Sequence, residues 1–171
     1  RDKKFFIACS HQSMFETFFL QTIFNSPVFI LKKELIKIPV FGWYLLKIGS
    51  ISIDRNKVKK ENLDFLSNIK SVVNSTNRPL IIFPQATRMN SNDRSTFKKG
   101  VSRIYDELKI ICQPIAINSG TVWPKSGKLV SNGKIIISIL DPILPGQDKK
   151  KFLNFLQDKI YKELDNISNL S

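Results

Sequence analysis

The sequence predicts a single α/β domain in which a mixed, partly parallel β-sheet is flanked by helices. Its 171 residues are enough for one domain with one sizeable core. Hydrophobic residues make up 42% of the chain, which indicates a globular fold and not disorder. Short runs typical of strands alternate with segments typical of helices, as in the βα units of a parallel sheet. We therefore expect residues 1–171 to form one domain.

Six runs along the chain have the length and composition of strands. Most are apolar and end at a polar residue, Pro or Gly, which indicates a buried strand, whereas the third alternates between apolar and polar residues. In chain order the predicted strands are FFIAC (5–9), PVFIL (27–31), SISIDR (50–55), RPLIIF (78–83), KIICQPIAIN (109–118) and GKIIISIL (133–140). Ligands of such sheets gather where strands end, so the polar residues there are the first candidates for a site.

Helical segments separate these strands. Ser13 and Glu16 have the spacing of a capping box at the start of the first one. Pro39 ends the second, and the later segments carry apolar residues at helical spacing on one face. In chain order the predicted helices cover residues 13–24, 32–38, 59–74, 95–108 and 148–164. The aromatic segment FGWYLLKIG (41–49) lies between the second helix and the third strand.

The chain is strongly basic, with 27 basic against 14 acidic residues and a net charge of +13. Residues 1–60 hold 11 of the basic and 4 of the acidic residues, a net charge of +7. This bias favours an anionic partner, which could be a phosphate, an anionic lipid surface or a nucleic acid, although lysine runs also occur as plain solvated faces. We find no nucleic-acid-binding motif and no basic–aromatic strand pair, so we expect no nucleic-acid partner.

No apolar stretch reaches the roughly 18–20 residues that span a bilayer, and no signal peptide is visible. The first predicted strand follows Arg1 almost at once, so we expect a membrane-associated segment upstream of this sequence. Cys9 and Cys112 both lie in apolar runs, which indicates buried free thiols in a reducing compartment. One histidine and two distant cysteines do not make a zinc site, so we expect no metal.

Four polar islands follow apolar segments. They are SHQSMFE (10–16), GSISIDR (49–55), FPQATR (83–88) and QPIAINSG (113–120). In this order and at these separations they resemble the four blocks of the 1-acylglycerol-3-phosphate acyltransferase family of glycerolipid acyltransferases. Residues 38–55 and 97–105 are also similar to that family, so the resemblance covers nearly the whole chain.

The resemblance implies a glycerolipid acyltransferase-like fold and an acyl transfer in phospholipid biosynthesis. The acyl donor would be acyl-CoA or acyl carrier protein, used as a co-substrate, with no resident cofactor. The acceptor would be the free hydroxyl of a lysophospholipid, most directly 1-acylglycerol-3-phosphate, which gives phosphatidic acid. The resemblance and the charge together imply an anionic membrane surface as partner, at the cytoplasmic face of the inner or plasma membrane.

In the first block, the family's catalytic histidine and acidic residue fall on His11 and Glu16. A neutral imidazole can take the proton of an attacking hydroxyl, and a carboxylate on its other nitrogen fixes the tautomer. Residues five apart lie about 140° apart on a helix, so the pair can meet only if His11 precedes the helix. Alternatively, Glu16 caps the backbone N–H of Ser13 and does not touch His11.

The second and third blocks supply the candidate substrate-binding residues. Arg88 is the first candidate for the acceptor phosphate, since a guanidinium binds phosphate oxygens in bidentate fashion. The resemblance adds Thr87, Gln85, Arg55 and Gly49. Surface ion pairs for the two arginines, and turn-forming roles for Thr87 and Gly49, are the alternatives.

The sequence also departs from the family pattern. Glu16 replaces Asp, Ser10 replaces Asn, Gln85 replaces Glu and Ala86 replaces Gly. Gln85 lacks the charge of Glu, and Ala86 adopts a positive φ less readily than Gly. These departures leave open a different lysolipid acceptor, or lipid binding without turnover.

Two further interpretations concern single segments. Cys9 and His11 alternate on a strand and so face the same side, which is compatible with a Cys–His hydrolase. Apolar surroundings would raise the pKa of the Cys9 thiol, which argues against it. The aromatic segment at residues 41–46 is either ordinary core or, with the lysines around it, an interfacial membrane anchor. Those lysines are Lys32, Lys33, Lys37 and Lys47.

Overall fold

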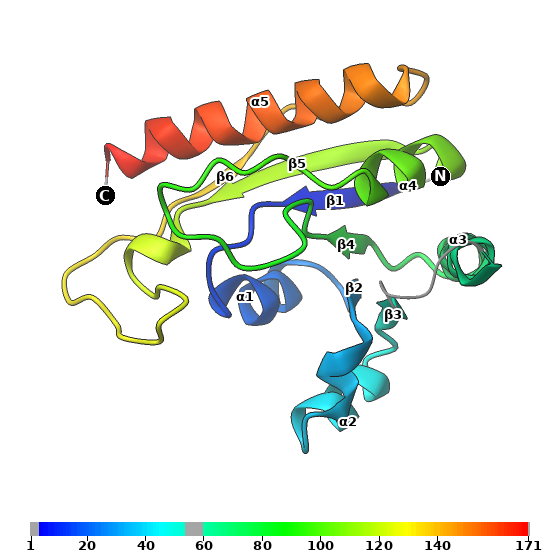
Figure 1. Ribbon diagram of the computed structural model, residues 1–171, viewed down its shortest axis with the longest axis horizontal. Coiled ribbons are helices and arrows are strands. Elements are labelled where there is room, and N and C mark those ends of the chain that lie inside the picture. The colour runs from blue at the N-terminus through cyan, green and yellow to red at the C-terminus, as the bar shows by residue number, and fades with distance from the viewer. Residues whose placement is uncertain (1–3, 54–59, 171) are drawn as a thin grey trace.

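The computed structural model describes residues 4–53 and 60–170, and in these ranges six strands form one sheet (Figure 1). The strands are β1 (Phe5–Cys9), β2 (Val28–Lys32), β3 (Ile51–Ile53), β4 (Leu80–Ile82), β5 (Ile111–Ile117) and β6 (Ile137–Ile139). Their order across the sheet is β3-β2-β4-β1-β5-β6. All neighbours are parallel except β6, which is antiparallel to β5. The predicted α/β domain with a mixed sheet is therefore confirmed.

The helices are α1 (Phe15–Ile23), η1 (Lys33–Lys37), α2 (Phe41–Lys47), α3 (Lys60–Ser75), α4 (Gly100–Leu108), η2 (Ser119–Thr121) and α5 (Lys149–Ser168), where η denotes 3₁₀ geometry. The aromatic segment 41–49 thus contains a helix, α2. Only residues 137–139 of the predicted strand 133–140 pair with β5.

The predicted helix 95–108 is wrong over its first five residues, since α4 begins at Gly100. The Asp93 carboxylate accepts the backbone N–H of Ser95 at 2.9 Å, a local turn that competes with a helix. The backbone N–H of Phe97 donates to Gln157 of α5 at 2.8 Å. These side-chain partners replace the hydrogen bonds that a helix would have supplied.

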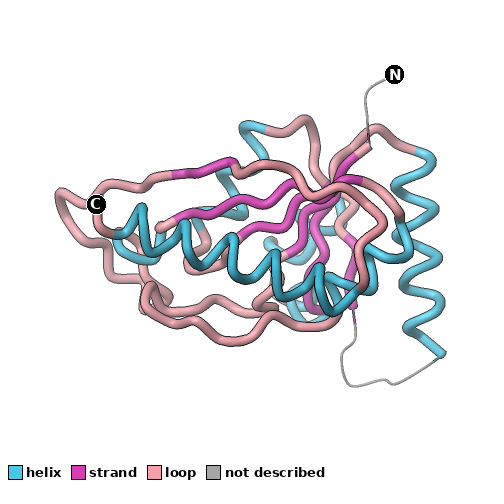
Figure 2. The backbone as a smooth tube through the Cα atoms, turned by 90° about the horizontal axis from the view of Figure 1, so that it is seen from above, coloured by secondary structure: helices cyan, strands magenta, loops and turns pink. Residues whose placement is uncertain are grey.

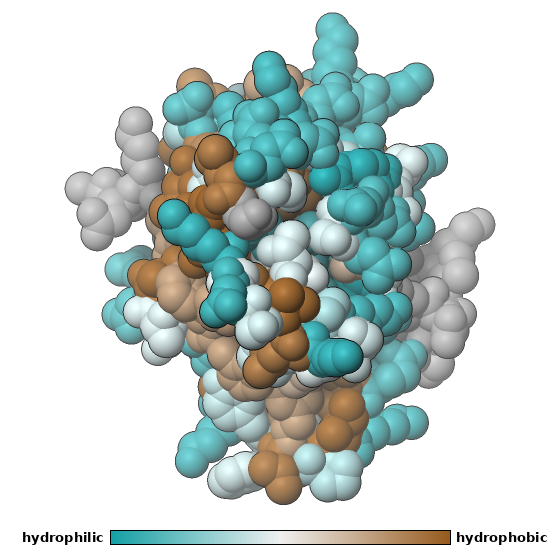
Figure 3. Space-filling model, turned by 90° about the vertical axis from the view of Figure 1, so that its left-hand side faces the viewer, coloured by the Kyte–Doolittle hydropathy of each residue, from teal (hydrophilic) through white to brown (hydrophobic). Residues whose placement is uncertain are grey.

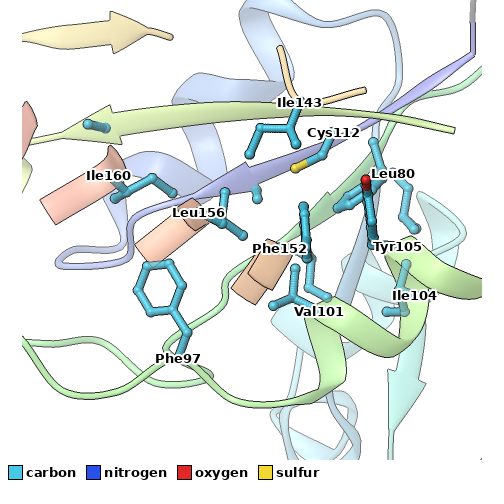
Figure 4. Packing of buried hydrophobic residues seen from close by; sticks show 14 of the residues in the cluster. Leu80, Phe97, Val101, Ile104, Tyr105, Cys112, Ile143, Phe152, Leu156 and Ile160 are labelled. Atoms are coloured by element: carbon cyan, nitrogen blue, oxygen red, sulfur yellow. The ribbon is translucent and has the colours of Figure 1, made fainter. Parts of the chain in front are cut away.

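Helices cover both faces of the sheet (Figures 1 and 2). Alternate residues of β1 point to opposite faces, so Phe6 packs with α3, α4 and α5 whereas Ile7 packs with α1 and α2. Figure 4 shows the first of these cores, where side chains of α4 and α5 meet over the sheet. There the rings of Tyr105 and Phe152 stack with their centroids 3.7 Å apart. Both cores hold β1 at the centre of the sheet, and the site begins where β1 ends.

Gly42 lets η1 and α2 pack against each other beside the end of β2. A Cβ atom at Gly42 would lie 1.9 Å from the carbonyl oxygen of Ile36, which is far inside van der Waals contact. This packing turns Leu45 of α2 toward the sheet, where it is 1% exposed. The η1–α2 unit thereby forms one wall of the cleft described below.

Replacing Gly42 by Ala should lower the free energy of unfolding by at least about 1–3 kcal/mol, because overpacking against a backbone carbonyl cannot be relieved by a side-chain rotation. Gly100→Ala is the matched control, since a Cβ at Gly100 meets no atom within 4 Å. That change should be neutral or should stabilise by about 0.4–1 kcal/mol. Chemical denaturation of the two variants measures both effects. A Gly42→Ala protein as stable as the parent would contradict the close η1–α2 contact.

Candidate active site at the ends of strands β1, β2 and β4

His11 lies in the turn between β1 and α1, and the segment after β4 holds it in place. Its backbone N–H donates to the side-chain oxygen of Gln85 at 3.0 Å, and its carbonyl accepts the backbone N–H of Met89 at 2.8 Å. The imidazole stacks on Phe83, with ring centroids 4.0 Å apart. Both the backbone and the ring of His11 are therefore positioned before any substrate binds.

Glu16 is fully buried, and its carboxylate gathers donors from two parts of the chain. One oxygen, Oε1, accepts the backbone N–H groups of Gln12 at 3.0 Å and Ser13 at 3.1 Å, and the hydroxyl of Ser119. The other, Oε2, accepts the Ser13 N–H at 3.0 Å and lies 3.5 Å from Nδ1 of His11. The carboxylate caps the helix and faces the imidazole at the same time, so the two predicted roles of Glu16 are compatible.

The capping box itself is present. Besides the bond from the Ser13 N–H to Glu16, the Ser13 hydroxyl accepts the backbone N–H of Phe15 at 3.2 Å. Met14 already has helical dihedral angles, although the regular helix is assigned from Phe15. His11 therefore precedes the helix and its ring returns to the first turn, which is the arrangement that the five-residue separation requires.

The position of Glu16 favours one tautomer of His11. Nδ1 is buried and makes no hydrogen bond to the described residues, and the 3.5 Å separation is longer than an ordinary N–H···O bond. The acceptor beside it is the Glu16 carboxylate, which favours a proton on Nδ1 and leaves Nε2 unprotonated. Hydrogen bonds in unliganded catalytic sites are often long and tighten when substrate binds.

A cleft of about 250 Å³ opens beside the imidazole. Its apolar wall comes from β2, η1, α2 and the residue after β4, namely Phe29, Leu31, Leu35, Phe41, Leu45 and Phe83. The polar residues that line it are His11, Thr17, Lys32, Thr87 and Arg88. A base and two cations thus share one cleft with an apolar wall.

The structure brings Arg88 and Thr87 to this cleft and places Gln85 elsewhere. Arg88 is half-buried and makes no hydrogen bond or ion pair with the described residues, and Thr87 is exposed beside it. Gln85 is 3% exposed, does not line the cleft and binds the backbone of His11. The contact that the structure shows for the Gln85 side chain is thus with the backbone of His11. Arg55 lies outside the described residues.

Gly49 does not line the cleft, and the structure gives it a turn-forming role, which is the alternative to substrate binding. It lies before β3, at the amino-terminal edge of the sheet, with φ of +72°. Its N–H donates to Leu46 and that of Ser50 donates to Leu45, both at 3.0 Å, which together form a Schellman motif at the end of α2. A Cβ there would also approach the Arg78 guanidinium to 3.1 Å.

The structure also accounts for two of the departures from the family pattern. Ala86 adopts a φ of +65°, so the left-handed turn typical of glycine is kept at a cost of roughly 1–2 kcal/mol. Ser10 joins β1 to β5, because its hydroxyl accepts the N–H of Ile117 at 2.8 Å and donates to the Ile117 carbonyl at 3.2 Å. Neither departure disturbs the turn that carries His11.

Two residues of the site were missed by the sequence analysis. Lys32 was counted only among the lysines near the aromatic segment, yet it lines the cleft at the end of β2. Ser119 belongs to the fourth polar island, and nothing in the local sequence indicates that its side chain reaches Glu16. Ser119 and Glu16 come together only because β1 pairs with β5.

The structure contradicts the interpretation as a Cys–His hydrolase. Cys9 is fully buried, and its thiol points to the carbonyl of Ser10 at 3.2 Å. Burial, and then the charge of Glu16, raise the pKa of the Cys9 thiol well above its usual range. The thiol therefore stays protonated at neutral pH and is not a nucleophile. Among the described residues, no group of His, Cys, Asp and Glu has a metal-binding arrangement.

The chain is similar in sequence to known acyltransferases. The chain is 33% identical over 138 residues to a 1-acyl-sn-glycerol-3-phosphate acyltransferase of Pseudomonas aeruginosa, a match that covers 81% of this chain and 53% of that protein. It is 31% identical over 146 residues to the protein of the same name from Saccharomyces cerevisiae, with 82% and 48% covered. The chain thus spans about half the length of these relatives.

The fold is also that of a solved structure. The crystal structure of the 1-acyl-sn-glycerophosphate acyltransferase PlsC from Thermotoga maritima superimposes with a TM-score of 0.77 at 22% identity, covering 98% of this chain and 68% of that one. The family model described as Acyltransferase matches residues 1–118, which include the first three polar islands and most of the fourth. The chain therefore belongs to the acyltransferase family.

Proposed function

We propose that this protein transfers a fatty acyl group from an acyl thioester, either acyl-CoA or acyl carrier protein, to the free hydroxyl of a lysophospholipid. The acceptor is most directly 1-acylglycerol-3-phosphate, and the product is phosphatidic acid. The observation that carries the proposal is the cleft in which His11, backed by Glu16, lies with the cations Lys32 and Arg88. The names of the relatives from Pseudomonas and Saccharomyces support it.

The geometry suits direct attack of the acceptor hydroxyl on the thioester. Nε2 of His11 takes the hydroxyl proton while the hydroxyl oxygen forms a bond to the carbonyl carbon. The carbon–sulfur bond then breaks, and the thiolate that leaves takes the proton from the imidazolium. Glu16, 3.5 Å from Nδ1, stabilises the imidazolium between these two steps and keeps the ring in one orientation. No group of the protein is acylated.

The charges and the apolar wall of the cleft suit a phosphorylated lipid. The guanidinium of Arg88 can bind two phosphate oxygens, and the ammonium of Lys32 adds a point charge from the end of β2. Arg88 has no partner among the described residues that would compete with a phosphate. The apolar wall, with Leu35, Phe41 and Leu45, can pack against the acyl chain.

His11→Ala should lower acyl transfer at least about 10²-fold, the usual scale for the loss of a general base, without unfolding the protein. The measurement uses the full-length protein in membranes with a labelled acyl donor and a panel of lysolipids, and a melting curve of the variant serves as the control. Since His11 is the sole histidine, no other imidazole can replace it. Retained turnover would refute the mechanism, and a parent protein without turnover on any lysolipid would favour lipid binding alone.

Arg88→Ala should mainly lower kcat/KM for the phosphorylated acceptor. The loss should be about 10- to 150-fold, which corresponds to one charged hydrogen bond of roughly 1.5–3 kcal/mol. Arg88→Lys should recover only part, because the fork of the guanidinium is absent. The comparison is kcat/KM for a lysolipid with a phosphate monoester and for one without it. An equal loss for both acceptors would show that Arg88 is structural.

We also propose that η1 and α2 bind an anionic membrane surface. Four apolar side chains of this unit are exposed to solvent: Ile38, Val40, Trp43 and Leu46. Figure 3 shows apolar surface at the lower end of the molecule, where Figure 1 places α2. Lys33, Lys37 and Lys47 of the same unit are also exposed, and Lys47 lies over the Trp43 ring. Aromatic side chains with lysines around them are typical of an interfacial anchor.

This surface would place the cleft at the lipid headgroups. Phe41 and Leu45 of α2 line the cleft, whereas Trp43 and Leu46 of the same helix face outward. No helix among the described residues has the length and apolarity needed to cross a bilayer. We assign the protein to the cytoplasmic face of the inner or plasma membrane, which the free buried thiols of Cys9 and Cys112 support.

The protein should bind anionic vesicles more tightly than neutral ones, and added salt should weaken this binding. Lys47→Gln should lower the affinity for anionic vesicles by about fivefold, since one cation near an anionic surface contributes about 1 kcal/mol. Trp43→Ala should weaken binding to both kinds of vesicle. Leu144→Ala is the control for Trp43→Ala. Leu144 is about as exposed as Trp43 but lies just before α5, outside the η1–α2 unit. Equal binding of the parent protein to both vesicles in a sedimentation assay would contradict the electrostatic part.

A further inference from the structure

Ser119 donates the one side-chain hydrogen bond that Glu16 receives from the described residues. It is the first residue of η2, lies two positions after the end of β5 and is completely buried. The other donors to the carboxylate are the backbone N–H groups of Gln12 and Ser13, which belong to the same turn as Glu16. Ser119 is 103 positions away along the chain.

The two oxygens of Glu16 have different partners, and Ser119 distinguishes them. An ionised carboxylate only accepts hydrogen bonds, so the Ser119 hydroxyl must be the donor. Its target is Oε1, and the oxygen that faces Nδ1 of His11 is Oε2. The Ser13 N–H reaches both oxygens, at 3.1 and 3.0 Å, and so does not select between them. The Gln12 N–H donates to Oε1 at 3.0 Å, so it favours the same orientation from within the turn, and Ser119 adds the side-chain donor from outside it. The glutamate arm also has one more rotatable bond than aspartate, so its orientation needs a further constraint.

We propose that Ser119 is a positioning residue: its hydroxyl holds the Glu16 carboxylate with Oε2 toward His11, so that the imidazole keeps the tautomer needed for catalysis. The inference rests on the acyl transfer proposed above, with His11 as its base. Ser119 does not line the cleft and acts through Glu16.

The backbone of η2 is held without help from this hydroxyl. The backbone N–H of Gly120 donates to the side-chain oxygen of Gln12 at 3.0 Å, and a Cβ at Gly120 would lie 2.9 Å from the Gln12 side chain. The Asn118 side chain accepts the N–H of Ile136 at 2.6 Å. The Ser119 carbonyl accepts the N–H of Trp123 at 2.8 Å. Removing the hydroxyl should therefore leave the turn in place.

The first test compares kcat and KM in three variants beside the parent protein and His11→Ala. Ser119→Ala should lower kcat roughly 10-fold or more, with KM for both substrates unchanged within about twofold, since Ser119 does not line the cleft. Ser119→Thr keeps a hydroxyl and should recover part of the rate. Thr121→Val is the control, because the Thr121 hydroxyl belongs to the same turn but donates to the Asn118 carbonyl at 2.8 Å. It should retain the parent kcat.

The second test is a double-mutant cycle with Glu16→Gln. If Ser119 acts through the charge of Glu16, adding Ser119→Ala to Glu16→Gln should lower kcat by less than about twofold. Losses that multiply in full would show that Ser119 has a structural role and would overturn the proposal. A kcat of Ser119→Ala equal to that of the parent protein would also overturn the proposal. In that case, a loss of turnover in His11→Ala would still leave the proposed function intact.

A third measurement does not depend on activity. The single imidazole can be observed by ¹⁵N NMR in protein labelled at histidine. Ser119→Ala should move the ¹⁵N signals of His11, and Thr121→Val should not. Unchanged signals in Ser119→Ala would refute the positioning role, even if the parent protein showed no turnover.

Discussion

A buried carboxylate costs several kcal/mol unless hydrogen-bond donors replace the water that it has lost. Glu16 is fully buried, and among the described residues no lysine or arginine pairs with it. Its donors are two backbone N–H groups of the turn that carries His11 and the hydroxyl of Ser119. The charge of Glu16 therefore stabilises the start of α1, fixes the turn after β1 and draws η2 against it. The same charge faces the imidazole, so the structural requirement and the proposed chemistry share one group.

The parallel sheet makes this arrangement possible, because the carboxyl ends of its parallel strands lie on the same side of the sheet. β1 lies between β4 and β5, and each neighbour contributes to the site. The segment after β4 supplies Gln85 and Phe83, which hold the backbone and the ring of His11. The turn after β5 supplies Ser119. On the other side of β4, the end of β2 carries Lys32 to the cleft. The apolar wall comes largely from η1 and α2, whose close packing depends on Gly42.

Local patterns in the sequence were enough for the strands, the capping box and the position of His11 before α1. Contacts between distant segments were not predictable in this way. Ser119 reaches Glu16 only because β5 pairs with β1, and Gln85 turns from the cleft because the His11 backbone needs an acceptor. Gly49 follows α2 and ends it, a role that the family resemblance did not distinguish from substrate binding. The start of α4 was misplaced because the side chains of Asp93 and Gln157 compete for backbone N–H groups.

The central claim is that Glu16 keeps a proton on Nδ1 of His11 and leaves Nε2 free as the base. Because the chain contains one histidine, ¹⁵N NMR of the histidine-labelled protein reports this ring alone. At a pH where the imidazole is neutral, we predict that Nδ1 carries the proton and that the ¹⁵N shift of Nε2 is that of an unprotonated ring nitrogen. A neutral ring protonated at Nε2, with Nδ1 bare toward Glu16, would contradict the account.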